Sequence, residues 1–262
     1  VRQYAISHLA NLADESLVET YTQILANKQE SNQVLYSTVV ALEKIGSKKV
    51  IPALKAATRS NSAIVRMHAA KLVHRLNSST AVVDLMYLLA DSDSYVKSTA
   101  ISALNQIGQP AMPNLVQTLD QNGENIVGSS FGEHQFIANA FIDNTRTANR
   151  RSAVQRSTLQ ILGDLKIENT VKILIQLLAN DELKASARNA LIKMGGKVVP
   201  QLIQTCQNMD ASVSVRVESA RALLSMGDLR ATEPLIDLLL DLNTPKEIQG
   251  ISAQFMGNTL SR

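Results

Sequence analysis

The sequence predicts an all-α, right-handed solenoid of about seven to eight stacked helix hairpins, and three observations lead to this fold class. An apolar, small, apolar, apolar pattern at offsets 0, 4, 8 and 11 returns about every 30 residues. These offsets share one face of a helix. Glycines follow the patterned helix in several repeats, and prolines recur a few residues later. The pattern begins at Val1, Val34, Val65, Val96, Val154, Leu183 and Val215.

The second position of the pattern is small in every repeat, as expected where two helices pack closely together. Its residues are Ala5, Thr38, Ala69, Ala100, Thr158, Ala187 and Ser219. The third position is aliphatic throughout, so the sequence predicts deep burial for residues such as Leu104 and Leu191.

Residues 96–119 illustrate the elements of one repeat. The Asp-Ser-Asp-Ser run at 91–94 supplies N-cap candidates for a first helix over 95–106. Gly108 ends that helix, because glycine tolerates the left-handed conformation. Pro110 or Pro113 opens a second helix, where its fixed φ fits. The apolar face of this helix is Met112, Leu115, Val116 and Leu119.

The same punctuation recurs along the chain. Glycines follow the first helix at Gly46, Gly108, Gly195 and Gly227. Prolines near the start of the second helix are Pro52, Pro113, Pro200 and Pro234. The intervening loops are short, which predicts that each repeat is an antiparallel hairpin.

We interpret residues 1–262 as a single solenoid with an insertion or a degenerate repeat at 121–152. Val1 already occupies the first pattern position, and Leu260 still lies inside a repeat. Solenoids normally cover their ends with polar capping repeats. We therefore expect the sequence to be part of a longer protein.

Two segments carry a resemblance to a known family. These are Val65-Arg66 with Ala69-Ala70, and Val215-Arg216 with Ser219-Ala220, Leu223 and Met226-Gly227-Asp228. They resemble HEAT repeats of the short bacterial type found in phycobilisome lyases and in many scaffold proteins. Two repeats depart from the pattern, because Asn77 and Lys166 replace the glycine after the first helix. The resemblance implies the fold, whereas its members have unrelated functions.

Composition excludes several classes of protein. The net charge of +3 is too small to favour nucleic acid or an anionic membrane surface. We find no signal peptide and no apolar run of about 18 residues that could insert into a membrane. The single cysteine, Cys206, continues an apolar stripe and is predicted to be a buried thiol. One cysteine per chain fits a reducing, cytoplasmic location.

A catalytic constellation is not visible in the sequence. The histidines His8, His68, His74 and His134 form no metal-binding spacing. Acidic pairs such as Asp14-Glu15, Asp91 with Asp93, and Asp181-Glu182 fall at helix starts or turns, where they favour capping. No phosphate-binding glycine loop occurs. We therefore expect a non-catalytic protein without a cofactor or a metal.

The interruption at 121–152 has an unusual composition. A glycine-rich stretch precedes an expected short helix at 133–143, and a cluster of arginines follows it. Under one interpretation this is a degenerate repeat with helices over 133–143 and 147–162. Under the other it is a recognition element, because aromatic and arginine side chains dominate interface energetics. The candidate partner-binding residues are Phe131, Phe136, Phe141, Arg146, Arg150 and Arg151.

The leading functional hypothesis is a scaffold or adaptor that binds a protein or peptide partner on a concave face lined by the second helices. Domains flanking this segment in the same polypeptide are also candidate partners. An alternative, implied by the resemblance, is a phycobilin lyase or bilin chaperone using Phe131, Phe141, Arg150 and Arg151. A third is a nucleic-acid-binding solenoid of the kind related to alkylpurine glycosylases, against which the mild net charge and the absence of tryptophan argue.

Overall fold

The computed structural model describes residues 1–76, 82–119 and 148–260. Within these ranges the backbone forms α-helices and short 3₁₀ helices and no strand, which confirms the predicted all-α solenoid. The chain divides into two compact units, Val1–Val154 and Gln155–Arg262. The boundary falls inside one helix, α10 (Ala148–Leu165).

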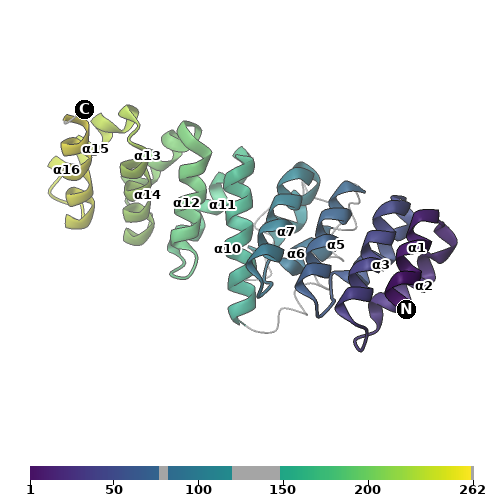
Figure 1. Cartoon of the computed structure of the whole chain (residues 1–262). Helices are drawn as coiled ribbons and strands as arrows, with labels where there is room; N and C mark the ends of the chain where they lie inside the picture. The colour runs from purple at the N-terminus through teal and green to yellow at the C-terminus, as the bar shows by residue number, and fades with distance from the viewer. Residues whose placement is uncertain (77–81, 120–147, 261–262) are drawn as a thin grey trace. The chain divides into compact units, whose positions relative to one another are not determined.

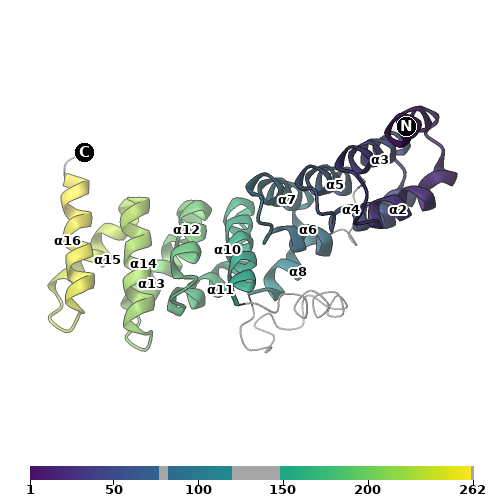
Figure 2. The same ribbon diagram turned by 60° about the horizontal axis from the view of Figure 1, so that its bottom comes forward.

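In unit 1 the helices alternate between two rows, with the first helix of each hairpin in one row and the second helix in the other (Figure 2). The first helices are α1 (Arg2–Leu9), α3 (Asn32–Ile45), α5 (Ala63–Arg75) and α7 (Ser94–Ile107). The second helices are α2 (Val18–Ala26), α4 (Ile51–Ala57), α6 (Val82–Leu88) and α8 (Met112–Gln117).

Unit 2 continues the same alternation after α10 (Figure 1). Its further first helices are α12 (Lys184–Met194), α14 (Val213–Met226) and α16 (Lys246–Leu260). The second helices are α11 (Val171–Gln176), α13 (Val199–Gln207) and α15 (Thr232–Leu240). Most second helices follow a 3₁₀ turn such as η5 (Gln109–Ala111) or η8 (Gly195–Val198).

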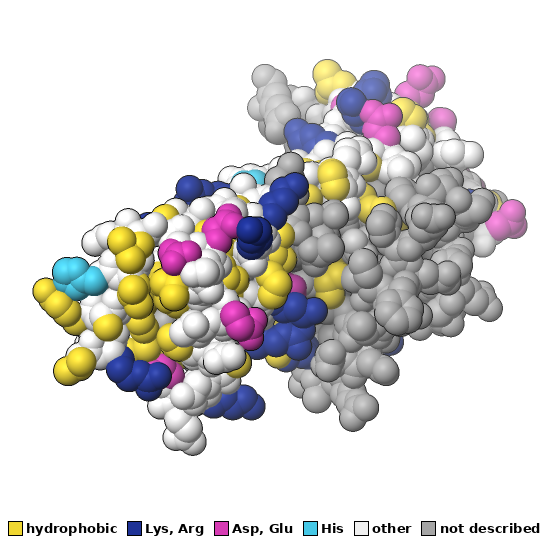
Figure 3. Space-filling view, turned by 90° about the vertical axis from the view of Figure 1, so that its right-hand side faces the viewer, with side chains coloured by type: hydrophobic (Ala, Val, Ile, Leu, Met, Phe, Trp, Pro, Cys, Tyr) yellow, Lys and Arg dark blue, Asp and Glu magenta, His cyan; other side chains and the backbone are white. Residues whose placement is uncertain are grey.

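The predicted helical register is confirmed from the second repeat onward. Leu104 and Leu191 are both fully buried, as are the small residues of the second pattern position from Thr38 to Ser219. The first repeat differs: the pattern residues of α1 and of the 3₁₀ turn η1 (Ala10–Leu12) after it are exposed, because this helix packs against a neighbouring repeat on one side only. Hydrophobic side chains gather on this end of unit 1 (Figure 3).

Helix starts and stops follow the sequence signals. The Asp93 side chain caps α7 by accepting hydrogen bonds from the amides of Tyr95 (2.9 Å) and Val96 (3.1 Å). Gly46 and Gly227 end their helices in the left-handed conformation, with φ of 62° and 60°. Lys166, which replaces the expected glycine, also takes a positive φ of 52°. The backbone at Lys166 therefore has the left-handed conformation that Gly46 and Gly227 have at the ends of their helices.

The turns between repeats share a feature that the sequence analysis missed. A side-chain oxygen accepts a hydrogen bond from the amide two residues later, which closes a short turn after the second helix. The accepting residues are Asn27, Ser60, Asp91, Asn180, Asn208 and Asp241. These polar residues therefore follow six of the described second helices, all but α8, and direct the chain into the next repeat.

The interruption is only partly within the described residues. The long helix predicted over 147–162 is present as α10, which extends to Leu165. The expected helix at 133–143 and the glycine-rich stretch before it lie outside the described residues.

Candidate functional site

Polar side chains join neighbouring first helices across most of the seams between repeats. In unit 1 the Lys44 ammonium of α3 donates to Asn11 (2.5 Å), which lies just after α1. Arg75 of α5 pairs with Glu43 of α3. In unit 2 the pairs are Lys193–Asp164 (2.6 Å), Arg188–Glu218 and Arg221–Glu247 (2.6 Å). Each of these cations has an oxygen acceptor on the adjacent repeat.

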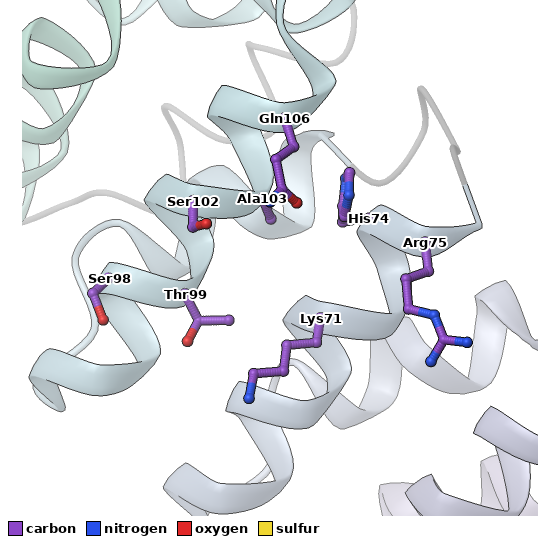
Figure 4. Close-up of a pocket in the computed structure, with 8 residues that line it drawn as sticks. All are labelled: Lys71, His74, Arg75, Ser98, Thr99, Ser102, Ala103 and Gln106. Carbon is purple, nitrogen blue, oxygen red and sulfur yellow. The ribbon is translucent and has the colours of Figure 1, made fainter. Parts of the chain in front are cut away.

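The seam between α5 and α7 is different. Among the described residues no ion pair joins these two helices, although they pack against each other. Instead an open groove of about 560 Å³ runs between them (Figure 4). The α5 wall consists of Lys71, His74 and Arg75, and the α7 wall consists of Ser98, Thr99, Ser102, Ala103 and Gln106.

The groove contains polar groups whose hydrogen-bonding capacity is not used within the fold. Lys71 takes part in no ion pair among the described residues, and its side chain extends into the space between the helices (Figure 4). The Nδ1 atom of His74 is buried and has no hydrogen-bond partner. Arg75 turns away from α7 and uses Nη1 for Glu43, which leaves Nη2 and Nε as donors. None of the lining residues is acidic.

Of the six predicted partner-binding residues, the structure describes only Arg150 and Arg151. Phe131, Phe136, Phe141 and Arg146 lie outside the described residues. Arg150 is half-buried: its guanidinium lies 4.1 Å from the centre of the Tyr87 ring and donates to the Tyr87 carbonyl (3.3 Å). Arg151 is exposed. Arg150 is therefore engaged within unit 1, whereas Arg151 lies at the surface.

The Tyr87 ring lies within a network of charges in unit 1. Arg59 also lies over the ring, at 5.3 Å from its centre, and pairs with Asp84 at 3.6 Å. Burial raises the pKa of Asp84, an effect that the charges of Lys55 and Arg59 oppose. Two arginines, Arg59 and Arg150, lie over the same aromatic ring, which favours a structural role for Arg150.

Two sequence models of repeat families match the chain. A model described as HEAT repeats matches residues 1–72 and 55–130, and a model described as PBS lyase HEAT-like repeat matches residues 215–241. The matches fall in both units and agree with the hairpin architecture. The chain belongs to the HEAT-repeat family.

The solved structures that match this chain are remote in sequence. Human deoxyhypusine hydroxylase in complex with glycerol is 16% identical, with 97% of this chain and 99% of that chain covered and a TM-score of 0.35. An engineered protein is 17% identical, with 98% and 97% covered and a TM-score of 0.27. A comparison with curated proteins found no sequence match.

A second groove lies in unit 2, on the side of the HEAT second helices. It has a volume of about 630 Å³, and its lining includes Pro200, Ile203, Gln207 and Arg230. Here the cation is already neutralised, because Arg230 donates to both oxygens of Asp228 (2.9 and 2.7 Å) and to the Gly196 carbonyl (2.7 Å). The sequence analysis expected a partner on this side of the hairpins.

The described HEAT repeats contain no group of three or more histidine, cysteine or acidic side chains that could hold a metal ion. Cys206 is fully buried, as predicted, and burial raises the pKa of its thiol to about 12. Such a thiol is protonated at neutral pH and is a poor nucleophile. In the same part of the chain no helix has the length and apolar character needed to cross a bilayer.

Proposed function

We propose that the chain is a non-catalytic scaffold that binds a protein or peptide partner in the groove between α5 and α7. The seam between α5 and α7 carries this proposal, because it forms an open groove. Lys71 has no oxygen partner there among the described residues, whereas the bridging cations Arg75, Lys193 and Arg221 each pair with a carboxylate of a neighbouring repeat. The buried Nδ1 atom of His74 lacks a hydrogen-bond partner, and such a group is costly, so a ligand that satisfies it gains affinity.

The α5–α7 groove is a better candidate than the groove of unit 2. The Arg230 guanidinium in unit 2 has its acceptors within the fold, so a ligand would have to compete with Asp228. Lys71, Ser102 and Gln106 offer donors that nothing in the described structure occupies. We therefore place partner binding on the first helices, in contrast to the sequence expectation of the second helices.

A peptide-display selection tests this proposal. Random peptides would be selected on the immobilised chain and then measured against two variants. Ser102→Trp fills the groove with a large side chain, and Ser225→Trp places the same side chain on an exposed serine of α14 as a control. We expect enriched peptides to lose binding to Ser102→Trp and to keep it with Ser225→Trp. Equal binding to both variants would contradict the proposal.

The bilin-handling alternative stays a prediction. Two of its four residues, Phe131 and Phe141, lie outside the described part of the chain, and Arg150 is already stacked on Tyr87. Mixing the protein with phycocyanobilin and recording the visible absorption band would test it. A shifted band that persists through gel filtration would favour the bilin hypothesis over the scaffold.

A further inference from the structure

We propose that the second helices of unit 2 form a separate docking surface for an amphipathic α-helix of a partner protein, whose apolar side chains recur every seven residues. This surface does not involve the α5–α7 groove, so it goes beyond the proposed function. Three observations carry it: a row of equivalent isoleucines, the spacing of the helices that bear them, and the acidic residues at one end of the row.

A Leu-Ile pair occurs at the same place in each second helix of unit 2. The isoleucine always stands five residues before the polar residue that closes the following turn, which is Asn180, Asn208 or Asp241. The leucine of each pair is fully buried in the core, whereas the isoleucine is half-buried or exposed. The pairs are Leu174-Ile175 on α11, Leu202-Ile203 on α13 and Leu235-Ile236 on α15. The three isoleucines are called the isoleucine row below.

The fold itself does not require the isoleucine row. Isoleucine has a lower helix propensity than glutamate, lysine or glutamine, so a polar residue would serve an exposed helix position at least as well. Single exposed apolar residues are common, whereas contiguous ones mark interaction sites. In unit 1 the residues five before the equivalent turn residues are Thr22, Lys55 and the fully buried Met86. An exposed apolar row is therefore particular to unit 2 and does not follow from the repeat pattern.

The isoleucine row lies on a face that is accessible to a ligand. Ile203 lines the groove of about 630 Å³ together with Pro200, Gln204 and Gln207, which share one face of α13. The equivalent face of α15 carries Ile236, which is 38% exposed, and one turn later a leucine that is 72% exposed, Leu240. The apolar surface is therefore broader than a single side chain.

The spacing of the second helices selects a helical partner. These helices follow one another in chain order along unit 2 (Figures 1 and 2), and α13 packs against α15. Packed helices lie about 8–10 Å apart. In a helix laid across them, side chains seven residues apart share one face and are about 10.5 Å apart along the axis. An extended strand instead places side chains of one face about 6.6–6.8 Å apart. A heptad repeat therefore stays in step with the isoleucine row, and a strand does not.

A polyproline helix fits this surface less well. It repeats every three residues, which is about 9.3 Å, so its period alone would match the row. Proline-rich segments are recognised by grooves lined with aromatic side chains. None of the described residues that line the groove at Ile203 is aromatic. The aliphatic side chains of the row suit the leucine, isoleucine or methionine side chains of an amphipathic helix.

The charge of the surface changes along the isoleucine row. The exposed carboxylates of Glu233 and Asp237 flank Ile236 on α15, whereas α11 carries the exposed Lys172. These groups are hydrated and do not need a partner, but they repel a ligand of the same charge. We therefore expect the partner helix to carry lysine or arginine where it crosses α15. The same carboxylates disfavour nucleic acid and anionic lipid on this surface.

A library of amphipathic helical peptides tests the inference. Peptides of about three heptads span roughly 30 Å, enough to cross three helices. They would be selected on the immobilised chain, and the consensus peptide, labelled with fluorescein, would be titrated by fluorescence anisotropy. The proteins compared are the full chain, Ile203→Gln, Ile236→Gln and Val213→Gln. Val213 is 53% exposed at the start of α14, outside the row, and serves as the matched control. Circular dichroism would check that all four proteins are equally folded.

We expect the selected peptides to carry apolar residues seven apart and basic residues at one end. Ile203→Gln and Ile236→Gln should each weaken binding by about tenfold, because each removes an apolar side chain that the partner buries. Val213→Gln should leave the dissociation constant unchanged. Asp237→Asn should weaken binding by about twofold to fivefold, and Asp210→Asn, in an exposed turn, should not. Ser102→Trp should have no effect, since the α5–α7 groove is not involved.

Each other result would overturn the inference. No enrichment, or equal binding to Ile203→Gln and Val213→Gln, would show that the row is not a docking surface. Selected peptides that contain prolines and lack a heptad pattern would exclude a helix as the ligand. A dimer of the chain in sedimentation velocity that dissociates in Ile236→Gln would assign the row to a second copy. The scaffold proposal is tested separately, because it depends on Ser102→Trp and not on the isoleucine variants.

Discussion

Arg66 and Asp91 form a two-pronged ion pair that joins the first helix of one repeat to the turn before the next repeat. The Arg66 Nε donates to Oδ2 at 2.7 Å and Nη2 donates to Oδ1 at 2.8 Å. Nη1 donates to the carbonyls of Ser60 (2.8 Å) and Asn61 (3.1 Å). One guanidinium thus fixes the turn before α5 and the turn after α6.

Replacing Asp91 by asparagine should destabilise unit 1. The change removes the carboxylate from a largely buried pair and leaves the guanidinium without a counter-ion, which we expect to cost on the order of 2–4 kcal/mol. The free energy of unfolding from urea titration measures this. Asp210→Asn, at an exposed position in a turn of unit 2, is the control and should change it little.

The same pair predicts a dependence on pH. Burial alone would raise the pKa of Asp91, but hydrogen bonds from Arg66 and from the Asp93 amide outweigh it, and the pKa lies below 3.8. A pKa that is lower in the folded state gives stability that is present above the unfolded pKa and is lost as pH falls through the folded value. The stability difference between the natural chain and Asp91→Asn should therefore shrink below about pH 4. A constant difference down to pH 2 would contradict this.

The third pattern position of the repeats should carry a large share of the packing energy. Leu104 is fully buried, so Leu104→Ala leaves a cavity and should cost about 2–5 kcal/mol. Leu242→Ala removes a leucine that is 95% exposed and should cost less than about 0.5 kcal/mol. Similar values for the two variants in urea titration would show that the register is wrong.

Gly163 marks a close approach of α10 to α12 in unit 2. A Cβ atom at this position would lie 2.8 Å from the Ala190 Cα and 3.1 Å from its carbonyl oxygen. Gly163→Ala should therefore force the helices apart and cost about 1–3 kcal/mol. Gly250→Ala, in α16, meets no atom within 4 Å and should instead stabilise by up to about 1 kcal/mol through helix propensity. Thermal unfolding of the two variants should thus shift in opposite directions.

Lys166 offers a site where the expected residue can be restored. It takes a φ of 52° after α10, in the region where glycine has no steric cost. Lys166→Gly should stabilise unit 2 by about 0.5–1.5 kcal/mol. Lys172→Gly is the control, because it places glycine inside the α11 helix and should destabilise by about 1 kcal/mol. A loss of stability in both variants would contradict the proposed strain at Lys166.

Much of the fold was predictable because several local signals agree. The helix expected over 95–106 is observed as Ser94–Ile107, since the apolar pattern, the Asp93 cap and Gly108 all point to the same limits. Asp91 was assigned to a turn, which is correct, but its pairing with Arg66 was missed. Pairing across a turn depends on tertiary geometry that a repeat pattern does not determine.

Arg216 and Asp241 demonstrate that limit. They have the same separation in sequence as Arg66 and Asp91, yet Arg216 donates through Nε to the Cys206 carbonyl (2.9 Å) and its buried Nη2 has no partner. Asp241 accepts instead from the Asn243 amide (3.0 Å) and the Thr244 hydroxyl (3.1 Å). Identical spacing in two repeats therefore gives two different hydrogen-bond networks.

The α5–α7 groove was missed for a related reason. Its signal is a carboxylate that α7 lacks, and this becomes visible only when equivalent residues of successive first helices are compared. Arg221, which has the position of Lys71 in its own repeat, pairs with Glu247 of the next first helix, whereas α7 lines the groove beside Lys71 with no acidic residue. The composition of residues 121–152 is unusual in the sequence alone, whereas the face of α7 that lines the groove has the composition of an ordinary helix.

Arg150 and Arg151 should be replaced one at a time in any experiment on residues 121–152. Arg150→Ala removes a half-buried guanidinium from the face of Tyr87 and should cost about 0.5–2 kcal/mol of stability. Arg151→Ala, at an exposed position, should cost less than about 0.5 kcal/mol. Partner binding by the segment is then tested with Arg151→Ala alone, because a loss of binding in Arg150→Ala would also follow from disturbing Tyr87. Equal melting temperatures for the two variants would show that the stacking on Tyr87 contributes nothing to the fold.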